Sequence, residues 1–421
     1  PLNFGRVLYS YKGAVKDVEI PKGVSLIEDY AFIGCDTLET LTLGYDVEEI
    51  GLYAFQNCVN LKTVNINDAL GVVSAGAFKG CVSLESMDFS ESTLATIGYE
   101  AFSDCLALNE VKLCETISEI GDYAFQGTAI KTIAFDKNVN SVGANSFLNT
   151  KNFESFDVIA KNKEFTAIDG VLFNKKATKL VSFPAAKLAN EEYTLPDSVN
   201  EIGEKAFYGT TVAVVSIGEN NSLERISVSA FENSNVTDLA LATSKIAKIE
   251  ASTFKNAANL KTIALPDTLT YIGADSFTGC AALAEIKIPD SVEEIATGAF
   301  KNTGLKSVNT GDGVAKIATD AFAGNKALTD LYIGKNVEKI GDNAFAGCTA
   351  LVAVNIPASL KYFNANAFDG CTALTKVSVD AENKAFKAVG DVIYSADGKT
   401  LVMVANKNAK SIAIANGTEV I

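Results

Sequence analysis

The sequence predicts a repeat solenoid with coils of about 23 residues, each holding one parallel β-strand and a short helical turn, with β-hairpin modules interspersed. Phenylalanine recurs fourteen times at intervals of 22, 23 or 24 residues, apart from one interval of 60. A turn-forming residue stands two positions after each phenylalanine, and a small residue follows it. The fourteen are Phe32, Phe55, Phe78, Phe102, Phe125, Phe147, Phe207, Phe231, Phe254, Phe277, Phe300, Phe322, Phe345 and Phe368.

The strand is predicted by an alternation of apolar and polar residues. It is clear in Leu61-Lys-Thr-Val-Asn-Ile66 and returns at 260–265, 283–288 and 351–356. Proline often follows, as at Pro266, and ends the strand because it has no backbone donor. We expect these strands to stack in parallel, one from each coil.

The helical turn is predicted by the motif Ala-Phe-x-x-Cys, which places apolar residues at the spacing of one helical turn. The residue before the Cys position is Gly or Asn in thirteen of fourteen copies and Asp104 in the other. These residue types adopt the left-handed conformation that closes a helix. Each coil is therefore expected to run from strand to a short apolar stretch ending in Ile-Gly, then to a capped helical turn.

The cysteines follow the same repeat, since seven of the eight stand three residues after a repeat phenylalanine. Other coils carry Thr, Ser, Ala or Asn there, which indicates a small, buried packing position. Stacked coils would hold the Cβ vectors of these cysteines parallel, an orientation that suits a disulfide poorly. We therefore expect free thiols.

Three segments interrupt the repeat, at residues 4–12, 160–190 and 385–407, and each joins a glycine to a short apolar run. Asp397-Gly398 is a strong hairpin-turn signal. The predicted organisation is one continuous solenoid with four parts. They are an N-terminal hairpin and first repeat block (1–158), a β-hairpin module (159–191), a second repeat block (192–384), and a hairpin module with a truncated coil (385–421).

Composition argues against several kinds of function. The net charge of −15 and the presence of only two arginines disfavour nucleic acid as a partner. The chain has no histidine, which excludes histidine-based catalysis and histidine-based metal sites. It also lacks the glycine motifs that bind phosphates or dinucleotides. No apolar run is long enough for membrane insertion, and no signal peptide is visible. We expect no enzyme activity, no cofactor and no bound metal.

The unit Ile288-Pro-Asp-Ser-Val-Glu-Glu-Ile-Ala-Thr-Gly-Ala-Phe300 resembles the repeat of BspA-like leucine-rich proteins. So do Ile340-Gly-Asp-Asn-Ala-Phe-Ala-Gly-Cys348 and the Gly-Val-Leu-Phe run at 170–173. The resemblance covers nearly the whole chain and implies a leucine-rich repeat solenoid. That family is typical of cell-surface or secreted proteins of host-associated bacteria, some described as adhesins, so the resemblance implies an extracellular or surface location and a binding role. It supplies no shared catalytic or ligand residues.

Candidate binding residues are the outward positions of the predicted strands, the default surface of a solenoid for a partner. Tyr332, beside Asn309 and Asn355, is the local cluster to test first. The six candidates are Asn309, Tyr332, Asn355, Lys287, Asp88 and Lys112.

The leading hypothesis is a monomeric, non-enzymatic interaction scaffold or adhesin that binds a host or bacterial surface protein or glycan through the strand face. One alternative is a polysaccharide-acting enzyme on a right-handed parallel β-helix, which should show two or three strands per coil. Another is a purely structural surface spacer.

Overall fold

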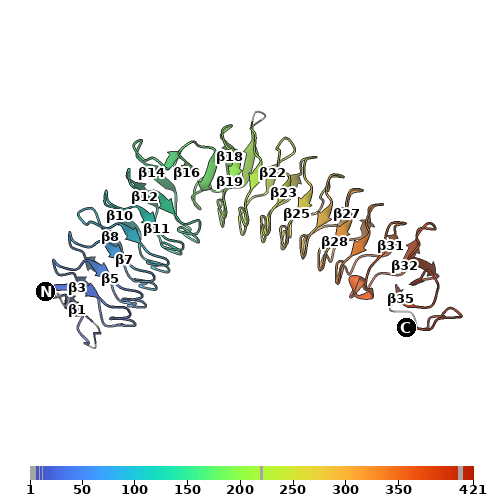
Figure 1. The fold of residues 1–421 in the computed structure, drawn as a ribbon, viewed down its shortest axis with the longest axis horizontal. Coiled ribbons are helices and arrows are strands. Elements are labelled where there is room, and N and C mark those ends of the chain that lie inside the picture. Colours follow the sequence, from blue (N-terminus) through green and yellow to red (C-terminus); the bar gives the residue numbers. More distant parts are fainter. Residues whose placement is uncertain (1–5, 9, 12, 219–220, 406–410) are drawn as a thin grey trace, which may run out of the picture. The chain divides into compact units, whose positions relative to one another are not determined.

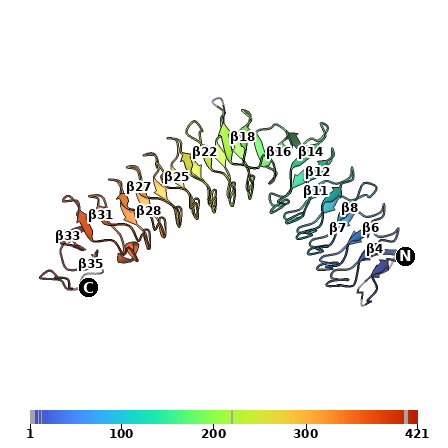
Figure 2. The same ribbon diagram turned by 180° about the vertical axis from the view of Figure 1, so that it is seen from behind.

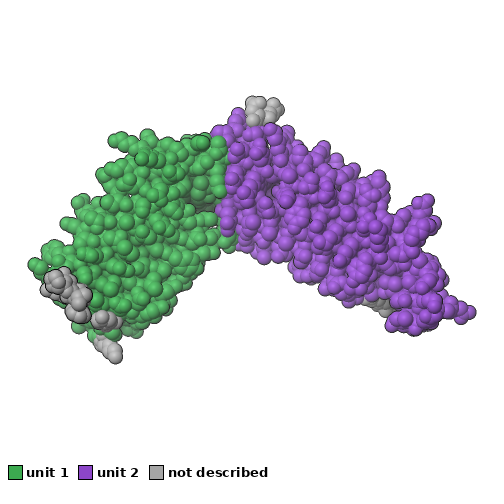
Figure 3. Space-filling view, viewed as in Figure 1, with its two compact units in different colours: residues 1–189, 205–210 green, residues 190–204, 211–421 purple. Residues whose placement is uncertain are grey.

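The chain folds into stacked coils, and the computed structural model describes residues 6–8, 10–11, 13–218, 221–405 and 411–421. The coils form two compact units (Figure 3). Unit 1 comprises residues 1–189 and 205–210, and unit 2 comprises residues 190–204 and 211–421. Within each unit, successive coils lie side by side in chain order (Figure 1). Part of the predicted N-terminal hairpin, including Gly5, lies outside the described residues.

Most coils contribute two short strands, so the predicted single strand per coil is wrong. The first strand is the predicted one, and the second lies in the stretch before the Ala-Phe motif. In unit 1 the first row is β2 (Asp17–Glu19), β4 (Thr40–Thr42), β6 (Thr63–Asn65), β8 (Ser86–Asp88), β10 (Glu110–Lys112), β12 (Thr132–Phe135) and β14 (Ser155–Val158). The second row is β1 (Arg6–Leu8), β3 (Val24–Ile27), β5 (Glu49–Ile50), β7 (Val72–Val73), β9 (Thr96–Ile97), β11 (Glu119–Ile120) and β13 (Ser141–Val142).

Unit 2 repeats this arrangement (Figures 1 and 2). Its first row is β18 (Glu192–Leu195), β20 (Val214–Ile217), β22 (Asp238–Ala240), β24 (Thr262–Ala264), β27 (Ser307–Asn309), β29 (Asp330–Tyr332), β31 (Ala353–Ile356) and β32 (Lys376–Val379). Its second row is β19 (Glu201–Ile202), β21 (Arg225–Ile226), β23 (Lys248–Ile249), β25 (Tyr271–Ile272), β26 (Glu294–Ile295), β28 (Lys316–Ile317) and β30 (Lys339–Ile340).

Where successive strands of a row pair, they pair in parallel, and their register places equivalent residues of successive coils opposite each other. Leu41 pairs with Val64 in the first row, and Ile50 pairs with Val73 in the second. The central residue of a first-row strand points into the core, as Val64 does, and its neighbours Thr63 and Asn65 are exposed. The predicted parallel stacking at about 23-residue spacing is therefore confirmed.

The Ala-Phe segments are successive turns, and the described residues contain no α-helix and a single 3₁₀ segment, η1 (Ala365–Phe368). The physical reason is the residue two positions before the phenylalanine, which has a positive φ in twelve of the fourteen coils, as at Tyr53 with φ 53°. A left-handed residue there prevents a continuous helical turn. The backbone bonds instead to the next coil, where Phe55 N donates to Ala77 O at 2.8 Å. The predicted helical turn is therefore not confirmed as a feature of the repeat, and only the coil of Phe368 has one, as η1.

The predicted left-handed residue that ends this segment is confirmed in every coil. The residue before the Cys position has a positive φ in all fourteen copies, including Asn57 at 59° and Asp104 at 61°. Asp104 adopts this conformation as the Gly and Asn residues do, because its short polar side chain tolerates the left-handed region.

The repeat phenylalanines form a column of stacked rings through the core of each unit. Ring centroids of Phe32 and Phe55 lie 4.7 Å apart, and those of Phe322 and Phe345 lie 5.3 Å apart with planes 1° from parallel. In unit 1, Phe153 stacks on Phe147 at 4.9 Å. The 60-residue interval therefore does not leave the end of that column bare, because Phe153 covers it.

The Cys position after each phenylalanine is a hydrogen-bonding position as well as a small one. The thiol of Cys81 donates to the carbonyl oxygen of Phe55 in the preceding coil at 3.1 Å. Thr150 and Asn325 donate to the equivalent phenylalanine carbonyls at 3.0 and 2.9 Å. All eight cysteines are free, as the sequence predicts, and all except Cys35 are buried.

Antiparallel strands occur in both predicted hairpin segments. The first has β15 (Phe165–Ile168), β16 (Val171–Asn174) and β17 (Lys179–Ser182), and the second has β33 (Phe386–Val389), β34 (Val392–Ser395) and β35 (Leu401–Val404). In each, the middle strand pairs with both of the others. The first strand of each set has no counterpart in the sequence prediction.

Candidate binding surfaces

The strand face consists of the outward side chains on the first-row strands. Alternation along a strand turns one residue into the core and its neighbours toward solvent, so an outward residue needs no packing role. The six predicted residues are all exposed. Four of them, Lys287, Asn309, Tyr332 and Asn355, belong to unit 2, and Asp88 and Lys112 belong to unit 1.

Tyr332 is held in a fixed position on the strand face of unit 2. It lies opposite Asn309 in the pairing of β27 with β29, and 49% of its surface is exposed. Its hydroxyl donates to Asp312 Oδ1 at 3.0 Å. Lys335 Nζ lies 2.9 Å from Asp312 Oδ2. The ring is thus presented to solvent while its hydroxyl is anchored at one end.

The charges around Tyr332 shift the ionisation of this group of side chains. Hydrogen bonds from Lys335 and Tyr332 stabilise the ionised carboxylate and lower the pKa of Asp312. The same carboxylate raises the pKa of Tyr332, because its hydroxyl proton is shared with a negative acceptor. At neutral pH the cluster therefore presents a neutral phenol beside a paired Asp–Lys couple.

The neighbours of Tyr332 occupy adjacent coils. Asn309 lies one coil before Tyr332, and Lys287, one coil earlier still, forms an isolated parallel bridge with Asn309. Strand β31, which carries Asn355, contacts β29 on the other side. Asn355 Oδ1 accepts a hydrogen bond from Ser378 at 2.7 Å. The structure thus arranges these four predicted residues along consecutive coils.

The two predicted residues of unit 1 neutralise each other. Asp88 lies opposite Lys112 in the pairing of β8 with β10, and Lys112 Nζ lies 3.1 Å from Asp88 Oδ2. Exposed ion pairs of this kind contribute at most about 1 kcal/mol to stability. The pair offers a partner little uncompensated charge.

A row of tyrosines on the turns of unit 1 was not predicted. Tyr30 stacks on Tyr53 with ring centroids 5.7 Å apart, and Tyr99 meets Tyr123 edge-on at 5.6 Å. Tyr30 and Tyr99 are about half exposed. The signal was present in the sequence, because Tyr30, Tyr53 and Tyr123 each stand two residues before a repeat phenylalanine. Tyrosine is enriched at the energetic centres of protein interfaces.

The described residues contain neither a metal-binding cluster nor a membrane-spanning helix. No group of three or more His, Cys, Asp or Glu side chains there is placed to hold a metal ion. No helix in the described part of the chain has the length and apolar character needed to cross a membrane.

Comparison with known proteins gives a family match. A model described as the BspA type leucine rich repeat region matches residues 3–94, 72–191, 186–304 and 272–389. Two strands per coil do not distinguish a leucine-rich solenoid from a parallel β-helix, and this match is what separates them. No curated protein matches the chain.

Several solved structures resemble the chain. A leucine rich cell surface protein from Faecalibacterium prausnitzii A2-165 is 21% identical, with 89% of this chain and 90% of that protein covered and a TM-score of 0.49. A leucine-rich repeat protein from Bacteroides ovatus ATCC 8483 is 23% identical, with 90% of this chain and 97% of that protein covered and a TM-score of 0.44. A leucine-rich repeat protein from Eubacterium ventriosum ATCC 27560 is 19% identical, with 98% of this chain and 92% of that protein covered and a TM-score of 0.47.

Proposed function

The chain belongs to the BspA-type leucine-rich repeat proteins, and from this premise we propose that it is a non-enzymatic interaction scaffold at the cell surface or outside the cell. Its strand face would bind a protein partner on a host or neighbouring cell. Stacked repeats present a long row of variable side chains on an invariant core, which suits recognition of a macromolecule. The absence of histidine from the sequence supports a binding role over acid–base catalysis at neutral pH.

The observation that carries this proposal is the anchored ring of Tyr332. A tyrosine that is already held by Asp312 loses little side-chain entropy when a partner covers it. Asn309, opposite Tyr332 on the preceding coil, supplies a polar neighbour, and Lys287 pairs with Asn309 one coil further away. A rigid aromatic group with polar neighbours is the usual composition of an interface hot spot.

The test is a binding screen of the intact chain against arrays of host-matrix and bacterial surface proteins, with glycan arrays in parallel. Tyr332→Ala should weaken binding of the protein partner by about tenfold or more, the loss typical of a hot-spot residue. Tyr45→Ala is the matched control, because Tyr45 is also an exposed tyrosine, at 84%, and does not lie on a first-row strand.

Three outcomes would overturn the proposal. Equal effects of the two tyrosine substitutions would remove the strand face as the binding surface. A complete absence of binding across the arrays would favour the purely structural spacer. Cleavage of a polysaccharide by hydrolase or lyase activity, abolished by one substitution, would instead favour an enzyme.

A further inference from the structure

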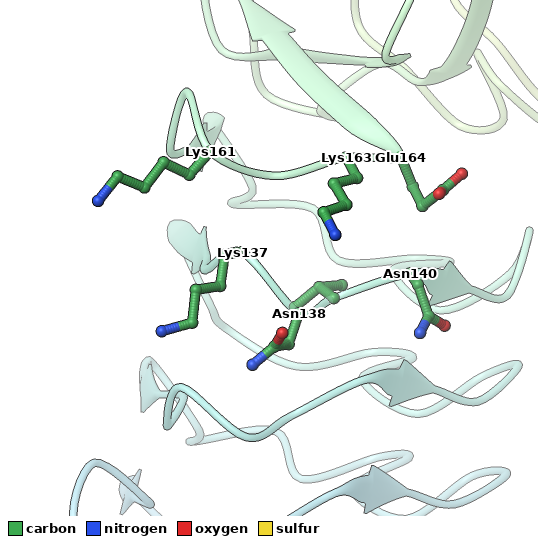
Figure 4. A pocket seen from close by; sticks show the side chains of 7 residues that line it. Lys137, Asn138, Asn140, Lys161, Lys163 and Glu164 are labelled. Atoms are coloured by element: carbon green, nitrogen blue, oxygen red, sulfur yellow. The ribbon is translucent and has the colours of Figure 1, made fainter.

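A basic hollow lies beside the first hairpin of unit 1, between two consecutive coils. It has a volume of about 470 Å³ and is partly open to solvent. Figure 4 shows the side chains that line it. Three lysines and two asparagine amides surround it, and one carboxylate borders it. These residues, called the lysine pocket below, are Lys137, Asn138, Asn140, Lys161, Lys163 and Glu164.

Two of the three lysines of this pocket carry charge that no ion pair within the described residues compensates. The chain has a net charge of −15, yet residues 159–187 contain six lysines and two acidic residues. Lys161 and Lys163 form no ion pair with any residue that the structure describes. Lys137 pairs with Glu115 at 2.8 Å. The carboxylate of Glu164 points away from the lysine ammonium groups (Figure 4).

A buried asparagine fixes the two sides of the lysine pocket to each other. Asn162 is 1% exposed, and its Nδ2 donates to the carbonyls of Asp136 and Val139 at 2.7 and 2.9 Å. Its Oδ1 accepts from the backbone N–H groups of Glu164 and Phe165 at 2.9 and 2.8 Å. The loop with Lys161 and Lys163 is therefore held against the segment with Lys137, and the spacing of the lysine backbones is set before any ligand arrives.

The second hairpin provides an internal comparison, because it has the same construction without the same charge. Asn383 donates to the carbonyls of Pro357 and Leu360 and accepts from the N–H groups of Ala385 and Phe386. The four bonds of Asn383 match those of Asn162 residue for residue. By this match, positions 358, 382 and 384 of the second hairpin are equivalent to Lys137, Lys161 and Lys163 of the first. The second hairpin has Ala358, Glu382 and Lys384 at those positions. The asparagine thus serves the fold, whereas lysines at positions 137 and 161 are not required by it, because the second hairpin has Ala358 and Glu382 there.

We propose that the lysine pocket binds an acidic saccharide, a sugar that carries carboxylate or sulfate groups. The volume lies in the usual range of small-molecule ligand pockets. Lysine ammonium groups neutralise the acid groups, and the Asn140 amide, which has no hydrogen bond within the described residues, can bond to sugar hydroxyls. The remaining lining residue, Val139, is buried, so an apolar ligand would find little surface. This site is separate from the strand face and does not depend on the proposed protein partner.

The test is titration calorimetry of the intact chain with three oligosaccharides of equal length: a sulfated heparin fragment, an oligogalacturonate and an uncharged maltooligosaccharide. At least one acidic oligosaccharide should bind, with an affinity that falls as salt is added. The uncharged one should not bind. The doubly substituted variant Lys161→Glu/Lys163→Glu should weaken binding by about tenfold or more, because two charge-assisted contacts become repulsive.

Lys176→Glu is the matched control, since it makes the same type of charge change on an exposed lysine of the same hairpin outside the pocket. It should change the affinity less than threefold, about the effect of a distant surface charge. Thermal unfolding of each variant checks that it is folded, and Lys161→Gln/Lys163→Gln replaces the charge reversal if that variant is not. Failure of both acidic oligosaccharides to bind would overturn the proposal. So would equal losses in the pocket and control variants, or equal binding of a polyglutamate peptide of the same charge.

Discussion

The ring of Tyr53 lies over Gly76 of the next coil, so closely that a Cβ atom at residue 76 would be 2.1 Å from Tyr53 Cε1. Both residues stand two positions before a repeat phenylalanine, and both have a positive φ, 53° and 61°. The glycine therefore does two things at once. It adopts the left-handed conformation without strain, and it makes room for an aromatic ring from the coil before it.

Gly76→Ala should destabilise the protein by about 1–3 kcal/mol, because the new methyl group must displace the Tyr53 ring and the left-handed conformation is strained for alanine. Chemical denaturation followed by circular dichroism measures the change. Gly34→Ala is the control, since Gly34 also has a positive φ, 67°, but nothing lies within 4 Å of its added Cβ. A loss at Gly76 no greater than at Gly34 would show that the ring contact is unimportant.

Phe78→Ala should destabilise unit 1 by about 3–5 kcal/mol, the usual cost of truncating a buried phenylalanine. Phe78 is fully buried and stacks on Phe55 at 5.2 Å and on Phe102 at 5.4 Å. Hydrogen exchange should show the largest loss of protection in the coils of Phe55, Phe78 and Phe102, because each coil contacts only its neighbours. Uniform loss of protection along unit 1 would contradict the nearest-neighbour expectation.

Cys280→Ser should reduce the dependence of stability on alkaline pH. Burial raises the pKa of the Cys280 thiol from 9.0 to about 12, because the thiolate would be desolvated. The folded chain thus holds this proton more tightly than the unfolded chain does. The resulting stability is complete below pH 9 and is lost as the pH rises toward 12. Denaturation midpoints of both proteins between pH 8 and pH 11 measure the difference, and parallel curves would refute the assignment.

Asn162→Ala should destabilise the first hairpin by about 1–3 kcal/mol, because it leaves buried backbone donors and acceptors without partners. Asn383→Ala should do the same in the second hairpin, whose asparagine makes four equivalent bonds. Hydrogen exchange of β15 and β33 reports each effect separately. If saccharide binding needs a fixed pocket, only the Asn162 variant should also weaken it.

The periodic part of the fold is predictable because every coil repeats the same core. The phenylalanine spacing and the Gly/Asn positions fix the stacking and the left-handed residues without any knowledge of contacts. The second strand escapes prediction because segments such as Glu49–Ile50 are two residues long. Two residues are too few for an alternation pattern, and their pairing partner is a whole coil away.

The helical turn was predicted because apolar spacing alone does not reveal backbone conformation. The missing information lay two residues before the phenylalanine, where Gly298, Asp275 and Asn343 are residues that tolerate a positive φ. Tyr53 and Tyr123 adopt the same φ without belonging to that class, so the pattern is hidden in the N-terminal coils.

For the candidate surfaces, exposure was predictable and partners were not. Alternation in β29 identifies Tyr332 as outward, but its bond to Asp312 depends on how the loop of the preceding coil is shaped. The lysine pocket left a partial signal, because Lys137 and Lys161 are separated by 24 residues, one coil length. The role of Asn162 between them follows only from the hydrogen bonds that it makes.

The inter-coil backbone bonds have a consequence for how such a protein changes over generations. Phe32 N donates to Ala54 O, and Phe322 N donates to Ala344 O, both at 2.7 Å, so distant coils present the same join. Recombination that duplicates or deletes one whole coil leaves this bond intact. The bond also tolerates one extra residue between the two strands, because β8 and β9 are separated by one residue more than β6 and β7 and Phe78 N still donates to Ala101 O at 2.8 Å. The protein can therefore change in length by whole coils during evolution. A duplicated coil already has the core residues that pack against its neighbours, and its outward residues are free to change under selection.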